Sequence, residues 1–150
     1  TLVNFGGINR IKRVTTQGYE LATAVAYLSG IQHYAERPER LAKISPAVKD
    51  CFSNIPSVWD DVKFLDGYPG KLFIVARRSG KNWYVAGMNG EATEKTIALD
   101  LSFIAHQKIG TIFNDATEQS SLLNATKFII NSTANNKITL QPNGGFLIVL

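Results

Sequence analysis

Residues 71–88, KLFIVARRSGKNWYVAGM, contain two apolar segments separated by the short polar stretch Ser79-Gly80-Lys81. A glycine-containing break between two runs rich in β-branched and aromatic residues predicts a β-hairpin. Similar short apolar segments, separated by turn residues, continue as far as Leu150. Strands at this spacing, without helical patterns between them, are typical of an antiparallel sandwich or barrel.

The other predicted strands are identified by a side-chain period of two and by the turn residues that separate them. Together with the hairpin they cover residues 62–65, 71–78, 82–88, 94–103, 109–114, 126–131, 137–141 and 146–150. We therefore expect residues 58–150 to form one all-β antiparallel sandwich.

The first third of the chain predicts helices instead. Thr16 follows Thr15 as a candidate N-cap, and an apolar run continues as far as Leu28, where Ser29-Gly30 ends it. A helix with so little polar surface is expected to be buried against a larger body. Residues 38–54 predict two further helical pieces, the second beginning at a proline after a serine N-cap.

Residues 31–35, IQHYA, predict a short buried strand between these helices. The order helix, strand, helix resembles the closing unit of a β/α barrel, and a lone barrel strand has no neighbours with which to pair. We therefore expect residues 1–57 to be the mainly helical end of a catalytic (β/α)8 barrel. The whole chain then reads as an α+β fragment of a larger protein.

Composition narrows the classes of function. Sixteen Lys and Arg against twelve Asp and Glu give a net charge of +4, but the basic residues are scattered. A nucleic-acid surface needs a concentrated basic stripe, so no nucleic-acid partner is expected. Cys51 is the only cysteine, and two histidines are too few for a histidine-rich metal site. No apolar run reaches the roughly 18 residues of a membrane span.

The pair Asp60-Asp61, beside Trp59, is the most evident candidate for glycosidase acid/base chemistry, which uses two carboxyl groups. Adjacent residues on an extended segment point to opposite faces, so these two would not share a substrate. A structural role is therefore the favoured interpretation, and no catalytic residue is assigned in this chain.

His33 and Glu36 are the candidate substrate-binding residues. If residues 31–34 form a barrel strand, Glu36 lies at its carboxyl end, where barrel active sites are built. A histidine such as His33 also titrates near neutral pH. The alternative is a half-buried histidine followed by an acid that initiates a helix at Pro38.

Four aromatic residues, Trp59, Tyr68, Trp83 and Tyr84, predict a second possibility, a platform on which sugar rings stack. Trp83 and Tyr84 are adjacent in a strand and must point to opposite faces, so at least one of them is expected in the core. A carbohydrate-binding module is therefore the alternative function.

A series of short motifs has a fixed order along the chain. They are Thr15-Thr16-x-x-Tyr19-Glu20-Leu21-Ala22, Ser29-Gly30-Ile31-Gln32, Ile55-Pro56-x-x-Trp59-Asp60-Asp61, Phe64-Leu65-Asp66-Gly67, Ala76-Arg77-Arg78-x-Gly80-x-x-Trp83-Tyr84-Val85-Ala86-Gly87-x-Asn89-Gly90, Leu99-Asp100-Leu101-Ser102-Phe103-Ile104 and Pro142-x-Gly144-Gly145-Phe146. In this order and spacing they resemble the end of the catalytic barrel and the C-terminal domain of glycoside hydrolase family 97.

The resemblance implies a three-part parent enzyme that hydrolyses α-glucosidic or α-galactosidic linkages, with a calcium ion near the site and a periplasmic location. In the family, the acid/base glutamates and the calcium ligands come from earlier barrel strands, so this chain is expected to hold no cofactor. The sandwich is expected to serve a structural role and to mediate contacts in a homo-oligomer. The partner of the parent would be an α-linked oligosaccharide.

Overall fold

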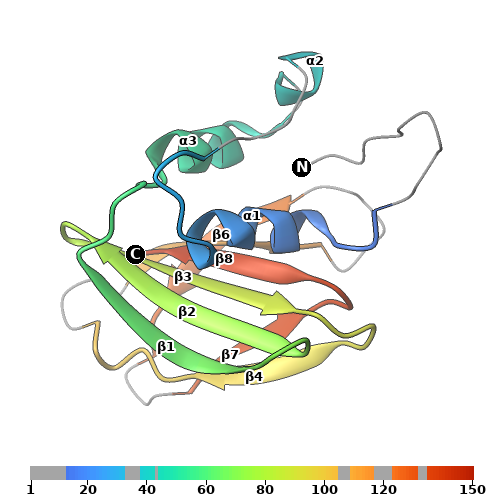
Figure 1. Ribbon diagram of the computed structural model, residues 1–150, viewed down its shortest axis with the longest axis vertical. Helices are drawn as coiled ribbons and strands as arrows, with labels where there is room; N and C mark the ends of the chain where they lie inside the picture. Colours follow the sequence, from blue (N-terminus) through green and yellow to red (C-terminus); the bar gives the residue numbers. More distant parts are fainter. Residues whose placement is uncertain (1–12, 33–37, 43, 105–108, 117–122, 132–134) are drawn as a thin grey trace.

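The computed structural model describes residues 13–32, 38–42, 44–104, 109–116, 123–131 and 135–150. Within these residues, strands form two sheets that face each other, and helix α1 lies on the outer side of the larger sheet (Figure 1). The chain is therefore α+β, with a helical segment followed by an antiparallel β-sandwich, as the sequence predicts.

The elements follow the chain in the order helices first, strands second. Their bounds are α1 Gln17–Ala26, α2 Pro38–Leu41, α3 Pro46–Asn54, β1 Asp61–Tyr68, β2 Leu72–Ser79, β3 Asn82–Asn89, β4 Lys95–Leu99, β5 Ile109–Asp115, β6 Leu123–Ile129, β7 Asn136–Leu140 and β8 Gly145–Val149. The larger sheet has the order β1-β2-β3-β8-β5-β6, and β4 pairs with β7 in the smaller one. Each predicted strand between residues 58 and 150 has a counterpart, although β1 extends further and β6 begins earlier than expected.

The β2–β3 hairpin forms where the sequence predicts it. Ser79 pairs with Asn82, which leaves Gly80 and Lys81 as a two-residue loop. Gly80 has φ +60°, a left-handed backbone conformation that glycine adopts without steric cost. The hairpin places β2 and β3 next to each other in the larger sheet.

The main core lies between the two sheets. It is made of side chains from β2, β3, β8 and the smaller sheet, among them Ile74, Leu140, Phe146 and Ile148, each at most 1% exposed. The ring of Phe146 lies directly over Gly87, where an added Cβ would be 2.2 Å from a ring carbon. This face of the larger sheet is closed.

A second core lies between the outer face of the larger sheet and the helices. Leu21, Ala22 and Val25 of α1 are fully buried against side chains of β2, β3, β5 and β8. The larger body against which the apolar helix was expected to be buried is the sheet of the same chain. The central strands β3 and β8 are apolar on both faces, so α1 packs against apolar side chains on the outer face.

The predicted strand at residues 31–35 is not found at the two positions that the structure describes. Ile31 and Gln32 are outside any strand, and Ile31 is 70% exposed. The physical reason is that no described strand pairs with them, and an unpaired strand leaves its backbone groups unsatisfied.

Among the described helices, none is long and apolar enough to cross a membrane.

Candidate functional site

The two candidate substrate-binding residues, His33 and Glu36, lie outside the described residues. The proposed role of this pair at the end of a barrel strand therefore stays a prediction.

The carboxylates of Asp60 and Asp61 do not converge on a shared site. The carboxylate of Asp60 accepts a hydrogen bond of 2.6 Å from the Gly80 N–H and lies 3.7 Å from the Arg78 guanidinium. The carboxylate of Asp61 accepts 2.8 Å from the Val62 N–H at the start of β1. Each of the two carboxylates accepts a hydrogen bond from a backbone N–H group, which is the structural role that the sequence favours.

The predicted aromatic platform does not form. Trp83 is buried in the core between the sheets, with its ring 5.0 Å from that of Phe103. Tyr84 is buried on the opposite face, where its ring lies 5.2 Å from that of Trp59. Tyr68 alone of the four aromatic residues is exposed, so they cannot stack together on a sugar.

The N-terminal end of α1 is fixed to the sheet by Asp115 at the end of β5. Its carboxylate accepts hydrogen bonds from the Thr16 hydroxyl (2.6 Å), the Gly18 N–H (2.8 Å) and the Gly145 N–H (3.0 Å). A negative charge at this end of a helix is stabilised by the free N–H groups. Gly18 and Gly145 are in direct backbone contact, because a Cβ on Gly18 would be 2.2 Å from the Gly145 carbonyl oxygen.

The C-terminal end of α1 meets a buried cation. Arg77 of β2 is 7% exposed, and its Nη2 donates to the Ala26 carbonyl oxygen at 3.2 Å. A cation is favourable at a helix C-terminus, but burial lowers the pKa of Arg77 because it disfavours the charged form. Among the residues that the structure describes, the buried Nε finds no hydrogen-bond partner. Asp115 and Arg77 thus hold the two ends of the helix.

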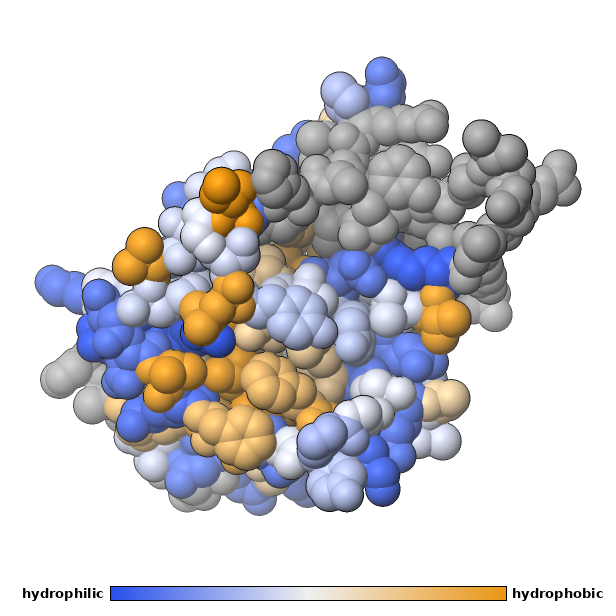
Figure 2. All heavy atoms as spheres, in the orientation of Figure 1, coloured by the Kyte–Doolittle hydropathy of each residue, from blue (hydrophilic) through white to orange (hydrophobic). Residues whose placement is uncertain are grey.

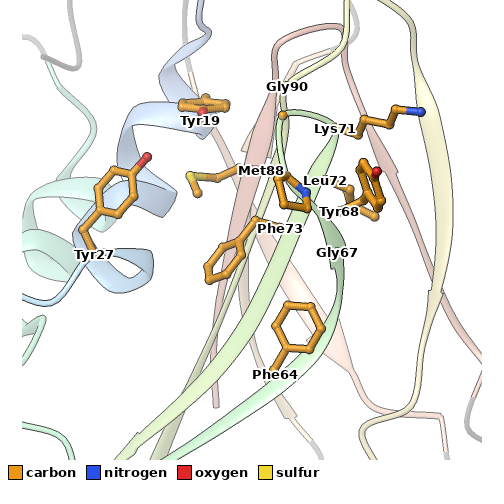
Figure 3. A pocket seen from close by; sticks show the side chains of 12 residues that line it. Tyr19, Tyr27, Phe64, Gly67, Tyr68, Lys71, Leu72, Phe73, Met88 and Gly90 are labelled. Atoms are coloured by element: carbon orange, nitrogen blue, oxygen red, sulfur yellow. The ribbon is translucent and has the colours of Figure 1, made fainter.

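A groove of about 490 Å³ lies beside α1. The helix-side core covers the central strands and Val75 of β2, and it leaves the outer face of the edge strand β1 exposed. Tyr19 and Tyr27 line the helix side of the groove, Phe64 and Phe73 line the strand side, and Met88 lies between them (Figure 3). Burial and the neighbouring Tyr27 raise the pKa of Tyr19. The groove lies between helix α1 and the β1 edge of the sheet.

The strand side of the groove belongs to an exposed apolar surface. Val62 and Phe64 of β1 are 55% and 64% exposed, and Tyr27 and Leu28 beyond α1 are 60% and 70% exposed. Figure 2 shows hydrophobic residues gathered on this face, which in Figure 1 is the side of β1 and β2. Large exposed apolar patches on folded domains are commonly interaction surfaces or ligand-binding grooves.

The described lining of the groove does not have the residues of a typical glycosidase site. Among the described residues it includes Lys71 and three tyrosines but no carboxylate and no histidine, whereas most glycosidases use a pair of carboxyl groups. A smaller pocket of about 270 Å³ contains one carboxylate, Asp50. Cys51 in the same pocket has its pKa raised to about 12 by burial and then by Asp50, so it is not a ready nucleophile.

Within the described ranges, no group of three or more His, Cys, Asp or Glu side chains could hold a metal ion. Calcium prefers six to eight oxygen ligands, and the calcium ion expected in the parent enzyme stays a prediction.

The groove and the Asp115 contact were missed from the sequence. Val62 and Phe64 do share one face of a period-two segment, which is a signal for an apolar strand face. It does not tell whether that face is covered. Asp115 is about a hundred residues from Thr16 in the chain, and no local pattern links them.

Comparison with known proteins now identifies the family. The sequence model described as "Glycosyl-hydrolase 97 C-terminal, oligomerisation" matches residues 58–150, which is more than half of the chain. A retaining α-galactosidase of Bacteroides thetaiotaomicron is 28% identical over 137 residues, covering 89% of this chain and 20% of the relative. A probable retaining α-galactosidase of Streptomyces bingchenggensis is 37% identical over 68 residues, 45% of this chain and 11% of the relative.

Solved structures agree with the sequence comparison. The crystal structure of a β-arabinopyranosidase superimposes with a TM-score of 0.84 at 29% identity, over 94% of this chain and 22% of the other. A glycoside hydrolase family 97 enzyme from Pseudoalteromonas sp. strain K8 gives a TM-score of 0.76 at 28% identity, over 95% and 23%. This chain therefore spans about a fifth of the length of such relatives. With the sequence match and the matching fold together, the chain belongs to glycoside hydrolase family 97, and residues 58–150 are its C-terminal, oligomerisation domain.

Proposed function

We propose that residues 58–150, with α1 fixed to them, serve as the assembly domain of a glycosidase and contribute no catalytic group. The observation that carries this proposal is the chemistry of the groove, whose described lining is aromatic and aliphatic with Lys71 as the one charged side chain among these residues. Apolar surface stabilises contacts between parts of a protein, because its removal from water is favourable. It offers neither an acid nor a base for hydrolysis.

The enzyme that we infer acts on α-linked oligosaccharides, as an α-galactosidase or an α-glucosidase. Two lines of similarity support this. Both curated relatives are named as α-galactosidases, and the similar Pseudoalteromonas enzyme has been solved in complex with acarbose. The proposal places the catalytic carboxylates and the calcium ion in the part of the enzyme outside this chain, and the enzyme in the periplasm.

The activity test compares the full-length enzyme with the 150-residue chain on nitrophenyl α-galactoside and nitrophenyl α-glucoside. We expect the full-length enzyme to cleave at least one substrate and to lose activity with a calcium chelator. The chain alone should give no turnover above the buffer rate. Hydrolysis by the 150-residue chain would overturn the assembly role, because a catalytic group would then lie within it.

The oligomer test is light scattering of the full-length enzyme over a range of concentrations. We expect a homo-oligomer of defined size. Deletion of residues 58–150 should abolish that oligomer, whereas an enzyme that is monomeric at all concentrations would contradict this part of the proposal. Titration of the chain with α-glucan oligosaccharides should give no heat, because Trp83 and Tyr84 are buried on opposite faces of the sheet and cannot join Tyr68 in a stacking platform.

A further inference from the structure

The larger sheet ends in two edge strands, β1 and β6, and their free edges differ. The edge of β1 is protected from pairing, because its register shifts between Phe64 and Asp66 and the exposed Lys63 lies on it. Strand β6 pairs with β5 in unbroken register over all of Leu123–Ile129, and Lys127 is its one charged side chain. Among the strands that the structure describes, none pairs with the other side of β6.

We propose that β6 pairs antiparallel with β6 of a second copy of this chain, which joins two larger sheets into one across a two-fold axis at Thr126. This inference rests on the proposed function and deepens it, because it names the surface through which the assembly domain forms a homo-oligomer. A second copy is the partner because the sequence model that matches residues 58–150 describes oligomerisation. A two-fold contact uses the same surface on both subunits, as two identical strands do.

The exposure of β6 is the first argument. Leu123 packs against the outer core and Phe128 against the inner one, so the side chains alternate between the two faces of the sheet. Residues 124–127 are nevertheless all exposed, which leaves both faces of the strand in water. The N–H and C=O groups along a free, regular edge of this kind are a ready template for another strand.

Strand geometry fixes the register of the pairing. Residues directly opposite each other point to the same face, so a two-fold axis perpendicular to the sheet must pass through a residue position and not between two. Thr126 is the middle residue of Leu123–Ile129, and an axis there pairs the whole strand. An axis at Lys127 would pair fewer residues and would place two lysines opposite each other, which is destabilising.

The register centred on Thr126 also brings apolar side chains together. It places Leu123 opposite the partner's Ile129 at both ends of the contact. Ile129 is 60% exposed, and it already lies opposite Ile109 of β5, which is 52% exposed. Each end of the contact would then hold a row of three apolar side chains, whose removal from water is favourable. At the axis, Thr126 meets its own copy, and threonine pairs stabilise antiparallel strands.

The first test oxidises the full-length enzyme that carries Thr126→Cys and follows the covalent dimer on a denaturing gel. On the axis the two Cα atoms would be about 5 Å apart, which a disulfide spans. Asn124→Cys, exposed on the same face, is the matched control, because its two copies would be about 13 Å apart along the strand. We expect at least about tenfold more dimer from position 126. The native Cys51 gives little background, because it is 7% exposed.

The second test uses the pair that the register makes between Ala125 and the partner's Lys127, which the axis generates twice. Ala125→Lys places like charges opposite each other, so the dissociation constant from light scattering on dilution should rise about fivefold or more. Adding Lys127→Glu to this variant should restore the association. Thr139→Lys, exposed on β7, is the matched control and should leave the association unchanged. All these positions are exposed, and circular dichroism checks that the fold is retained.

Three outcomes would overturn the inference in an enzyme that light scattering shows to be oligomeric. They are the absence of a covalent dimer at position 126, equal dimer formation at positions 124 and 126, and an oligomer that Ala125→Lys does not weaken. A full-length enzyme that is monomeric at all concentrations refutes the assembly role itself. The failure of this inference and the failure of the proposed function are therefore distinguishable.

Discussion

The two faces of the six-stranded sheet are built from the same strands but are finished in different ways. On the inner face, β4 and β7 close the sandwich over a core in which Phe146 and Ile148 are fully buried. On the outer face, α1 covers the central strands and leaves β1 exposed, with Phe64 in water. The core between the sheets stabilises the fold, whereas the apolar side chains of β1 remain available for contacts.

The difference arises from strand position in the sheet. Strands β3 and β8 are central and are apolar on both faces, so each face needs a cover. Strand β1 is an edge strand whose side chains are mostly exposed, and three of them, Val62, Phe64 and Tyr68, are large hydrophobic residues. The same strand carries the exposed Lys63 and a register irregularity, two features that protect an edge strand from pairing with another strand.

The largest effect is expected on the inner face. Phe146→Ala should lower the free energy of unfolding by about 3–5 kcal/mol, because it removes a fully buried ring and leaves a cavity above Gly87. Urea denaturation of the 150-residue chain measures this, with Phe146→Leu as a milder control that should lose less than about 1.5 kcal/mol. A loss below about 1 kcal/mol for the alanine variant would mean that the inner face is not the main core.

The next effect is at the contact that holds α1 on the outer face. Asp115→Ala should lower the free energy of unfolding by about 2–3 kcal/mol, since three donors lose their acceptor and two are backbone N–H groups. Hydrogen exchange of the α1 amides should accelerate more than that of the β2 and β3 amides. Asp66→Ala, at an exposed position of β1, is the matched control and should leave both measurements unchanged.

A smaller effect of opposite sign is expected at the other end of α1. Arg77→Met should raise the free energy of unfolding by about 1 kcal/mol. Replacement of buried charged groups by apolar side chains of similar volume is often neutral or stabilising by about 1–4 kcal/mol, because the buried charge is no longer desolvated. At Arg77 the unpaired Nε adds to that cost, whereas the hydrogen bond to Ala26 and the helix C-terminus oppose it.

Thermal and urea unfolding of the 150-residue chain measure this change. Arg78→Met, at a partly exposed site paired with Asp60, should change the stability by less than about 0.5 kcal/mol. A marked loss of stability in Arg77→Met would show that the hydrogen bond to Ala26 outweighs the burial of the charge.

The smallest effect is expected at Phe64, which is exposed on β1. Phe64→Ala should change the free energy of unfolding of the 150-residue chain by less than about 0.5 kcal/mol, because most of the ring is already in water. In the full-length enzyme the same substitution should lower the melting temperature measurably. A large loss in the isolated chain would mean that Phe64 packs within this domain, and the contrast between the two faces would then disappear.

Much of the fold follows from local sequence patterns. Thr16 as N-cap, Ser45 before Pro46, and Gly80 in the β2–β3 loop lie where the patterns predict them. The apolar alternation also places Trp83 and Tyr84 on opposite faces. These features depend on contacts between residues close in the chain, so a reader of the sequence can find them.

The candidate site was much less predictable. The sequence directed attention to His33 and Glu36 and to a row of aromatic residues, of which Trp83 and Tyr84 are buried. The groove depends on the placement of α1 across β3 and β8, and the carboxylate of Asp115 is what fixes one end of that helix. Such contacts join residues about a hundred positions apart in the chain. Side-chain periodicity and short motifs describe neighbouring residues, so they do not predict these contacts.

The amino-acid sequence by itself determined the order of the elements, the turns and caps that bound them, and the family to which the chain belongs. The tertiary structure alone decided which face of the sheet α1 covers, which carboxylates accept hydrogen bonds from backbone N–H groups, and which apolar side chains remain exposed on β1. The reason is physical: turns and caps are short-range interactions, whereas burial depends on everything that packs against a surface.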